Sequence, residues 1–211
     1  VVDTMPRPGL KVGIPREFIF TDGISDEVKQ SMEQTIDKLK SQGVEIVDIS
    51  IPLLKNSLAL YYILVPAEVS SNMARYDGVR YGKKVEGKDL LADYMETRGH
   101  LLGREVKKRI VLGTYILSAG YHDAYYRKAC ILRDRLVADV KKVFTEVDAI
   151  MMPTTPDTSF KIGEKIDDSL ALYLADIFTV TANLVGVPAI SVPYTTGQDE
   201  NENPVRGTAS G

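Results

Sequence analysis

The stretch that decides the fold is LKVGIPREFIFTDGISDEVKQSMEQTIDKLKSQGVEIVDISI, residues 10–51. Its two ends, Leu10–Pro15 and Val44–Ile51, are typical of short strands. Between them, apolar side chains recur at spacings of four, four and three residues, at Val28, Met32, Ile36 and Leu39. This period predicts an amphipathic helix that begins after Ser25 as N-cap and ends at Gly43. A strand, a helix and a strand in this order form a βαβ unit, so we expect an α/β fold with a parallel sheet.

After this unit the apolar period is helical almost throughout residues 53–147. Pro66 is expected to kink or divide the first of these helices, because proline lacks the amide hydrogen that a helix uses. We expect a short helix over residues 89–97, another over residues 104–117, and the longest from Tyr121 onward. These helices are expected to cover a sheet.

The last third of the chain mixes strand and helix patterns. Val147–Met152 and Pro188–Pro193 are predicted as strands, the second of them buried, and Ser169–Leu184 is predicted as one helix. Residues 197–211 have no apolar period and are rich in Gly, Asn, Glu and Asp. We expect them to be a mobile tail or an artificial end of the chain.

The 211 residues are 44% apolar and 26% charged, a globular composition, and their formal net charge is -3. This charge argues against a dedicated DNA-binding protein or a membrane-surface protein, both of which would be strongly basic. The longest mostly apolar stretch, residues 58–69, contains Pro66 and Glu68 and is shorter than the roughly 20 residues of a transmembrane helix. The start, VVDTMPRPG, has no initiator Met and no leader pattern, so we expect the chain to begin inside a longer gene. Cys130 is the only cysteine, which excludes an internal disulfide and favours a reducing cytoplasm.

The motifs of several common enzyme classes are absent from the sequence. The two histidines, His100 and His122, are 22 residues apart and match no metal-ligand spacing. The chain has no G-x-S-x-G elbow, no G-x-x-x-x-G-K-S/T loop and no G-x-G-x-x-G turn. We therefore expect neither a metal site nor a nucleotide cofactor in this chain.

Basic residues gather in the helical part of the chain. Between Arg104 and Phe144 there are ten Lys and Arg residues against four Asp and Glu residues. One interpretation is a set of solvated helix faces. The other is a local surface for RNA or for an acidic partner, since phosphate contacts need clustered cations even in an acidic protein.

Two isolated charges lie in apolar surroundings. Asp176 follows the apolar run at residues 170–175, where its carboxylate must be exposed, paired or functional. Arg109 precedes Ile110, Val111 and Leu112, and its guanidinium keeps its charge wherever it points. Together they suit a zwitterionic amino acid, because a guanidinium binds an α-carboxylate with two hydrogen bonds and a carboxylate accepts from an α-ammonium. The alternatives are a structural salt bridge or two separate surface charges.

Several blocks of the sequence resemble one family. They are residues 67–82 (AEVSSNMARYDGVRYG), 112–126 (LGTYILSAGYHDAYY), 152–156, 160–164 and 176–193. These blocks are similar to the second half of the A-subunit family of aspartyl/glutamyl-tRNA amidotransferases, which are amidase-signature enzymes. The resemblance implies that residues 1–196 are the C-terminal portion of an amidase-signature domain, with a mixed sheet and covering helices.

The function implied by this resemblance is glutamine hydrolysis that supplies ammonia for tRNA-dependent amidation. In the family, subunits B and C are partners, and the partner subunit uses ATP and magnesium to convert misacylated Glu-tRNA(Gln) or Asp-tRNA(Asn). The family's Ser–cis-Ser–Lys triad lies in its first half, upstream of Val1, so we expect this chain alone to be inactive. Two alternatives remain: a fragment of a general amidase-signature hydrolase, or a non-catalytic interaction module.

The resemblance also implies three glutamine-binding residues and no catalytic residue. Local alignment places the family's pocket tyrosine on Tyr61, with Tyr62 as the adjacent possibility, its arginine on Arg109 and its aspartate on Asp176. The last two agree with the charge argument above. Tyr61 also fits a core position, because it lies in the apolar segment LALYYIL. We expect the side chains of Arg109 and Asp176 to open onto one cavity.

Overall fold

The computed structural model describes residues 7–160, 169–192, 195–198 and 204–206. The chain divides into two compact units, the first made of residues 1–58 and 134–211 and the second of residues 59–133. No helix in the described part of the chain is long and apolar enough to cross a membrane. Lys161–Glu164 of the fourth family block and Pro193 of the predicted strand lie outside the described residues.

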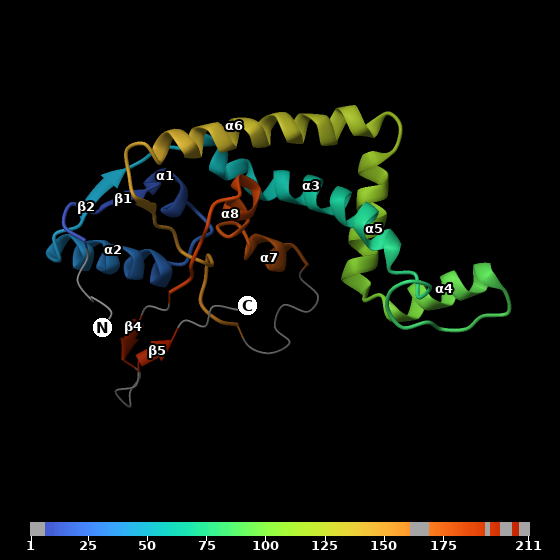
Figure 1. The fold of residues 1–211 in the computed structure, drawn as a ribbon. Coiled ribbons are helices and arrows are strands. Elements are labelled where there is room, and N and C mark those ends of the chain that lie inside the picture. Colours follow the sequence, from blue (N-terminus) through green and yellow to red (C-terminus); the bar gives the residue numbers. More distant parts are fainter. Residues whose placement is uncertain (1–6, 161–168, 193–194, 199–203, 207–211) are drawn as a thin grey trace. The chain divides into compact units, whose positions relative to one another are not determined.

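The first unit is built on a three-stranded parallel sheet (Figure 1). The strand order is β2 (Glu45–Asp48), β1 (Lys11–Ile14) and β3 (Ala149–Ile150). Lys11 pairs with Glu45 on one side of β1, and Val12 pairs with Ala149 on the other, both in parallel register. The predicted βαβ unit and the α/β fold are confirmed. The strand predicted at residues 147–152 is shorter than expected, because only two of its residues pair.

Helix α2 (Asp26–Ser41) joins β1 to β2 as predicted. The hydroxyl of Ser25 accepts a hydrogen bond from the Val28 amide at 3.4 Å, which caps the first turn. The apolar stripe of the helix is buried, and Ile36 is fully inaccessible. It packs into a core that includes Ile14, Met32 and Phe178. The apolar side chains that recur along this helix therefore face the sheet, as expected of an amphipathic helix.

Phe178 joins the C-terminal part of the chain to this core. Its ring is 2% exposed and meets Phe18 of the short helix α1 (Arg16–Ile19) edge-to-face, with ring centroids 5.2 Å apart. Around it, the single helix predicted for residues 169–184 is wrong. The chain forms α7 (Ser169–Leu174), a run of turns, and α8 (Val180–Val185), which ends at Gly186 in the left-handed conformation.

The second unit is helical. It contains α4 (Leu90–Leu101), α5 (Arg104–Leu117) and most of α3 (Ser57–Asn72). It also contains the π-helical turn His122–Tyr126 and the start of α6 (Arg127–Val143). Helix α3 continues through Pro66 and is not divided there. Helix α5 has the predicted bounds, whereas α4 is longer than expected and is capped by Asp89, whose carboxylate accepts from the Ala92 amide at 2.8 Å.

Helices α3 and α5 cross at a glycine. A Cβ atom placed on Gly113 of α5 would overlap the carbonyl oxygen of Pro66 and would lie 2.8 Å from Cβ of Ser70, both in α3. Gly113 is itself buried. This close approach of two helix backbones positions α5, which also carries Arg109.

Two short 3-10 helices and a pair of strands complete the described chain. The short 3-10 helices η1 (Pro52–Asn56) and η2 (Met73–Arg75) precede and follow α3. The strands β4 (Thr195–Gln198) and β5 (Pro204–Arg206) pair antiparallel, which the sequence did not lead us to expect. The predicted extent of the domain, residues 1–196, stays a prediction.

Candidate functional site

The three predicted glutamine-binding residues belong to different units. Tyr61 lies in α3 and Arg109 in α5, both in the second unit, whereas Asp176 lies between α7 and α8 in the first. The structure therefore defines the local surroundings of each side chain. The meeting of Arg109 and Asp176 around one ligand stays a prediction.

The guanidinium of Arg109 is hydrogen-bonded to a residue of its own helix. Its Nε donates to Oε1 of Glu105, one turn earlier, at 3.2 Å, and the side chain is 33% exposed. The guanidinium carries five N–H donors, and among the described residues only the one on Nε has an acceptor. Its two terminal nitrogens have no acceptor in the part of the chain that the structure describes, and arginine favours binding a carboxylate through such a pair of nitrogens.

Asp176 is exposed on the turn that follows α7. Its backbone carbonyl accepts hydrogen bonds from the Val180 amide and the Thr179 hydroxyl, both at 3.2 Å. These two hydrogen bonds stabilise the turn. Its carboxylate forms no ion pair with the residues that the structure describes. Phe178, two residues later, anchors the turn in the core. Of the three alternatives for Asp176, the structure thus excludes a pairing within the described chain.

Tyr61 is half-buried on α3. Its ring meets Tyr62 edge-to-face, with centroids 5.4 Å apart and an interplanar angle of 84°. This contact orients Tyr61 through a neighbour in sequence, which suits either a core position or one wall of a site.

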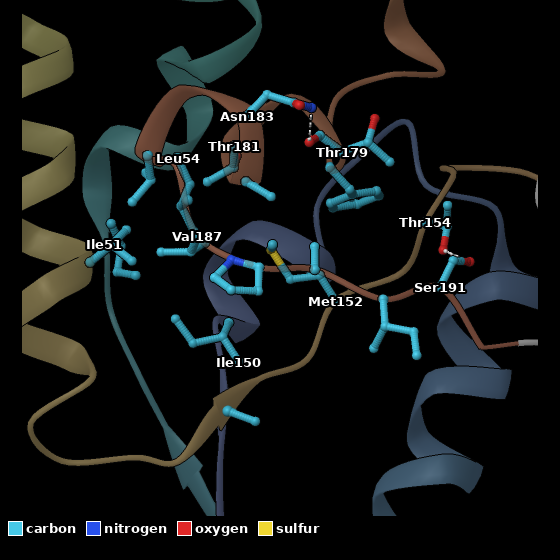
Figure 2. A pocket seen from close by; sticks show the side chains of 18 of the residues that line it. Ile51, Leu54, Ile150, Met152, Thr154, Thr179, Thr181, Asn183, Val187 and Ser191 are labelled. Carbon is cyan, nitrogen blue, oxygen red and sulfur yellow. Dashed lines mark hydrogen bonds between the residues drawn. The ribbon is translucent and has the colours of Figure 1, made fainter. Parts of the chain in front are cut away.

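The first unit contains a cavity that sequence reasoning did not find (Figure 2). Its volume is about 750 Å³, and its walls come from the residues after β3, from α8 and from the segment that follows α8. None of the three predicted residues lines it. The available signal was the run Thr179, Thr181 and Asn183, where polar residues alternate with apolar ones.

The cavity walls are mostly apolar and carry a few hydroxyl and amide groups. Thr154 and Ser191 face each other across a hydrogen bond of 3.3 Å, and Asn183 Nδ2 donates to the Thr179 carbonyl at 3.2 Å. Thr181 is 5% exposed, and its hydroxyl has no hydrogen-bond partner among the described residues. A buried hydroxyl without a partner is costly, so Thr181 marks a place where a polar atom would be stabilising.

The only charged side chain among the described cavity walls is already engaged. The Asp148 carboxylate accepts from the Lys11 amide at 2.9 Å and pairs with Arg7 at 2.7 Å. The Lys11 amide first, and Arg7 second, hold the pKa of Asp148 below its ordinary value. Because a lowered pKa makes this carboxylate a weaker proton acceptor, Asp148 is a poor general base.

The described residues hold no cluster of three or more histidine, cysteine or acidic side chains that could bind a metal ion. His100 is exposed beside Glu96 at 2.9 Å, and His122 is exposed beside Asp123 at 3.2 Å. Within the described ranges each histidine has one carboxylate neighbour, which is an ordinary surface arrangement.

Comparisons of the sequence and of the structure with known proteins find the same family. The Amidase family model matches residues 5–208. The A-subunit of glutamyl-tRNA(Gln) amidotransferase from Thermodesulfovibrio yellowstonii is 54% identical over 185 residues, and that from Maricaulis maris is 51% identical over 191 residues. These alignments cover 88% and 90% of this chain, but only 38% and 39% of the two relatives.

A solved relative has the same fold. The crystal structure of the glutamyl-tRNA(Gln) amidotransferase A-subunit from Thermotoga maritima is 38% identical, with a TM-score of 0.65 over 94% of this chain and 38% of that one. The resemblance found in the sequence is thereby confirmed, and the chain spans about two fifths of the length of its relatives. With a family model over nearly its whole length and relatives more than half identical to it, this chain belongs to the amidase family.

Proposed function

We propose that this chain is part of the glutamine-hydrolysing subunit of a tRNA-dependent amidotransferase. The observation that carries the proposal is the high identity to glutamyl-tRNA(Gln) amidotransferase A-subunits. It is supported by the exposed carboxylate of Asp176 and by the guanidinium of Arg109, whose terminal nitrogens have no acceptor among the described residues. The cytoplasmic partners would be subunits B and C. They would use ATP and magnesium on misacylated tRNA, and this chain would contribute to the supply of ammonia.

The role of this chain would be to bind the glutamine substrate. The terminal nitrogens of Arg109 would bind the α-carboxylate of glutamine, and the carboxylate of Asp176 would accept from its α-ammonium group. Tyr61 would contact the ligand through its ring or hydroxyl. These contacts would hold the side-chain amide of glutamine in position for attack, whereas the attacking nucleophile would come from the family's first half.

The chain would not hydrolyse amides by itself. Among the described residues, no serine hydroxyl is hydrogen-bonded to a lysine amine: Ser70 and Ser118, for example, donate to the carbonyls of Ala67 and Tyr115. A serine without such a base is a poor nucleophile. A glutaminase assay on the purified chain should therefore stay at background, and turnover that depends on one of its serines would contradict the proposal.

The alternative of a general amidase-signature hydrolase is less well supported. The similarity to a solved amidase has a TM-score of 0.69 but only 18% identity, and at that level it shows the fold alone. The A-subunit relatives are about 50% identical, which favours the amidotransferase.

The decisive experiment uses glutamine and two analogues that each lack one charge. Nuclear magnetic resonance titration of the chain should show weak, saturable binding of glutamine. We expect an analogue without the α-carboxylate and one without the α-amine to bind at least tenfold more weakly, since each loses a charged hydrogen bond worth about 1.5–3 kcal/mol.

The variants assign each charge to one residue. Arg109→Met should abolish the preference for glutamine over the analogue without a carboxylate, and Asp176→Asn should abolish the preference over the analogue without an amine. Arg104→Met, at an exposed position at the start of α5, is the matched control and should bind like the unmodified chain. Equal effects of Arg104 and Arg109 on glutamine binding would show that the predicted site is wrong.

A further inference from the structure

We propose that Glu105 is a positioning residue for Arg109, because its carboxylate holds Nε and so leaves the two terminal nitrogens of the guanidinium to bind a carboxylate ligand. This inference rests on the proposed function, in which Arg109 binds the α-carboxylate of glutamine. Glu105 itself would not contact the ligand. It would act through the orientation of the arginine side chain.

The first observation is the contact between the two side chains. Oε1 of Glu105 accepts a hydrogen bond from Nε of Arg109 at 3.2 Å. The residues are four positions apart on α5, so their side chains lie on the same face of the helix. An acidic residue four positions before a basic one is also the order in which such pairs are most favourable. The contact lies entirely within one helix of the second unit.

The second observation is which nitrogen Glu105 binds. A guanidinium can bind a carboxylate with two parallel hydrogen bonds along either of two edges. One edge consists of Nε and a terminal nitrogen, and the other consists of the two terminal nitrogens. Because Glu105 accepts from Nε, it occupies the first edge of Arg109 and leaves the second. An incoming α-carboxylate is therefore directed to the end of the guanidinium.

The third observation concerns the other end of the arginine side chain. Gly113 follows Arg109 by four residues, so the two positions share one side of α5. That side faces α3, because a Cβ atom on Gly113 would overlap the carbonyl oxygen of Pro66. The Arg109 side chain is accordingly less exposed than that of Glu105, at 33% against 48%. The helix crossing thus fixes the backbone of Arg109, and Glu105 restrains its guanidinium.

Restraint of this kind should strengthen binding. Arginine has a long side chain that loses rotamer freedom when it binds a ligand. If Glu105 already restricts the side chain in the free protein, less freedom is left to lose on binding. Removal of the hydrogen bond from Glu105 should therefore weaken glutamine binding about three- to tenfold. Ligands that do not use Arg109 should be unaffected.

A purely structural role for Glu105 makes a different prediction. Glu105 lies in the first turn of α5, where a negative charge stabilises the helix. Glu105→Gln and Glu105→Ala both remove this charge, but only glutamine keeps an oxygen that can accept from Nε. Alanine is the better helix former. If Glu105 only stabilised the helix, the alanine variant would bind glutamine at least as tightly as the glutamine variant.

The test compares these two variants of the full chain by nuclear magnetic resonance titration. Glu105→Ala should bind glutamine about three- to tenfold more weakly than Glu105→Gln, and both should bind the analogue without an α-carboxylate equally. Combined with Arg109→Met, the two substitutions should bind glutamine equally, because no guanidinium remains to be oriented. Equal affinities of Glu105→Ala and Glu105→Gln for glutamine, with Arg109 present, would overturn the inference.

The chain contains a matched control for this pair of variants. Glu96 on α4 forms the same kind of contact with His100, four residues later, at 2.9 Å, and its side chain is 49% exposed. Glu96→Ala and Glu96→Gln should bind glutamine with equal affinity. If alanine at position 96 weakened binding as much as alanine at position 105, the effect would not belong to Arg109, and the inference would be overturned.

A measurement without ligand distinguishes this inference from the proposed function. The Nε hydrogen of Arg109, assigned by its loss in Arg109→Met, should exchange with water at least about fivefold faster in Glu105→Ala than in Glu105→Gln. Equal exchange in both variants would overturn the inference, even if glutamine binds and the proposed function stands. Absence of glutamine binding would count against the proposed function, whereas faster exchange only in Glu105→Ala would still support the role of Glu105 in orienting Arg109.

Discussion

Gly113 is the position where a single methyl group should matter most in the helical unit. Gly113→Ala would place a Cβ atom over the Pro66 carbonyl oxygen and 2.8 Å from Cβ of Ser70, so that α3 and α5 must separate. Because a backbone carbonyl cannot rotate away as a flexible side chain can, the cost should lie near the upper end of the roughly 1–3 kcal/mol for overpacking. The gain from replacing glycine inside a helix is about 1 kcal/mol. We therefore expect a net loss of about 2 kcal/mol.

The chain contains a matched control for this substitution. Gly99 also lies within a helix, α4, but a Cβ atom there meets nothing within 4 Å. Gly99→Ala should thus keep the helix gain without the clash and stabilise the unit by about 0.5–1 kcal/mol. The two alanine variants should differ by about 3 kcal/mol, which is the overpacking cost alone.

Urea unfolding followed by circular dichroism measures both effects. With a slope of about 2 kcal/mol per molar urea, Gly113→Ala should lower the midpoint by about 1 M. Because Arg109 is one turn before Gly113 on α5, the same variant should weaken glutamine binding, whereas Gly99→Ala should not. A Gly113→Ala protein as stable as the Gly99→Ala protein would refute the close crossing of α3 and α5.

Two further predictions concern protonation. The hydrogen bond with Tyr121, followed by burial, raises the pKa of Tyr115 to about 12, so tyrosinate absorbance should include a late-titrating component that Tyr121→Phe shifts toward 10. Since the folded-state pKa is the higher one, the associated stability should be complete below the ordinary pKa of 10 and be lost as the pH rises through about 12. The pKa of Asp148 is instead lowered in the folded state, first by the Lys11 amide and then by Arg7. Its contribution should be present above the ordinary carboxyl pKa and be lost as the pH falls through the lowered value. Asp148→Asn should remove this acid dependence from urea midpoints measured across pH, whereas Asp37→Asn, at a surface carboxylate 3.6 Å from Lys40, should leave it in place.

Local patterns predicted the regular elements of the chain well. The α2 period, its Ser25 cap and the bounds of α5 depend on residues within a few turns of one another, so the sequence carries them. The helix predicted over residues 169–184 is divided for a tertiary reason. Phe178 packs on Phe18, which is 160 residues earlier in the chain. Phe178 lies in the turn between α7 and α8, and Asp176 in the same turn is exposed.

The candidate site, too, was predicted only in part from the sequence. Charge in apolar surroundings was enough to single out Arg109 and Asp176, because an ionised group there needs water or a partner. The sequence could not show that Glu105 accepts from Nε of Arg109, nor that the buried hydroxyl of Thr181 has no partner among the described residues, since both depend on side-chain positions. The cavity was missed because its walls come from segments as distant as Ile51 and Ser191.

The sequence by itself determined the parallel βαβ start, the helical middle and the amidase family, since each follows from local periodicity or from blocks of residue identity. Only the tertiary structure decided that α3 and α5 approach closely at Gly113 and that Asp176 is exposed. It also decided that residues 188–192, predicted as a buried strand, are exposed and pair with no strand among the described residues. The physical reason is that local preference sets which conformation a segment favours. Burial and pairing depend on which other segments are there to pack against it.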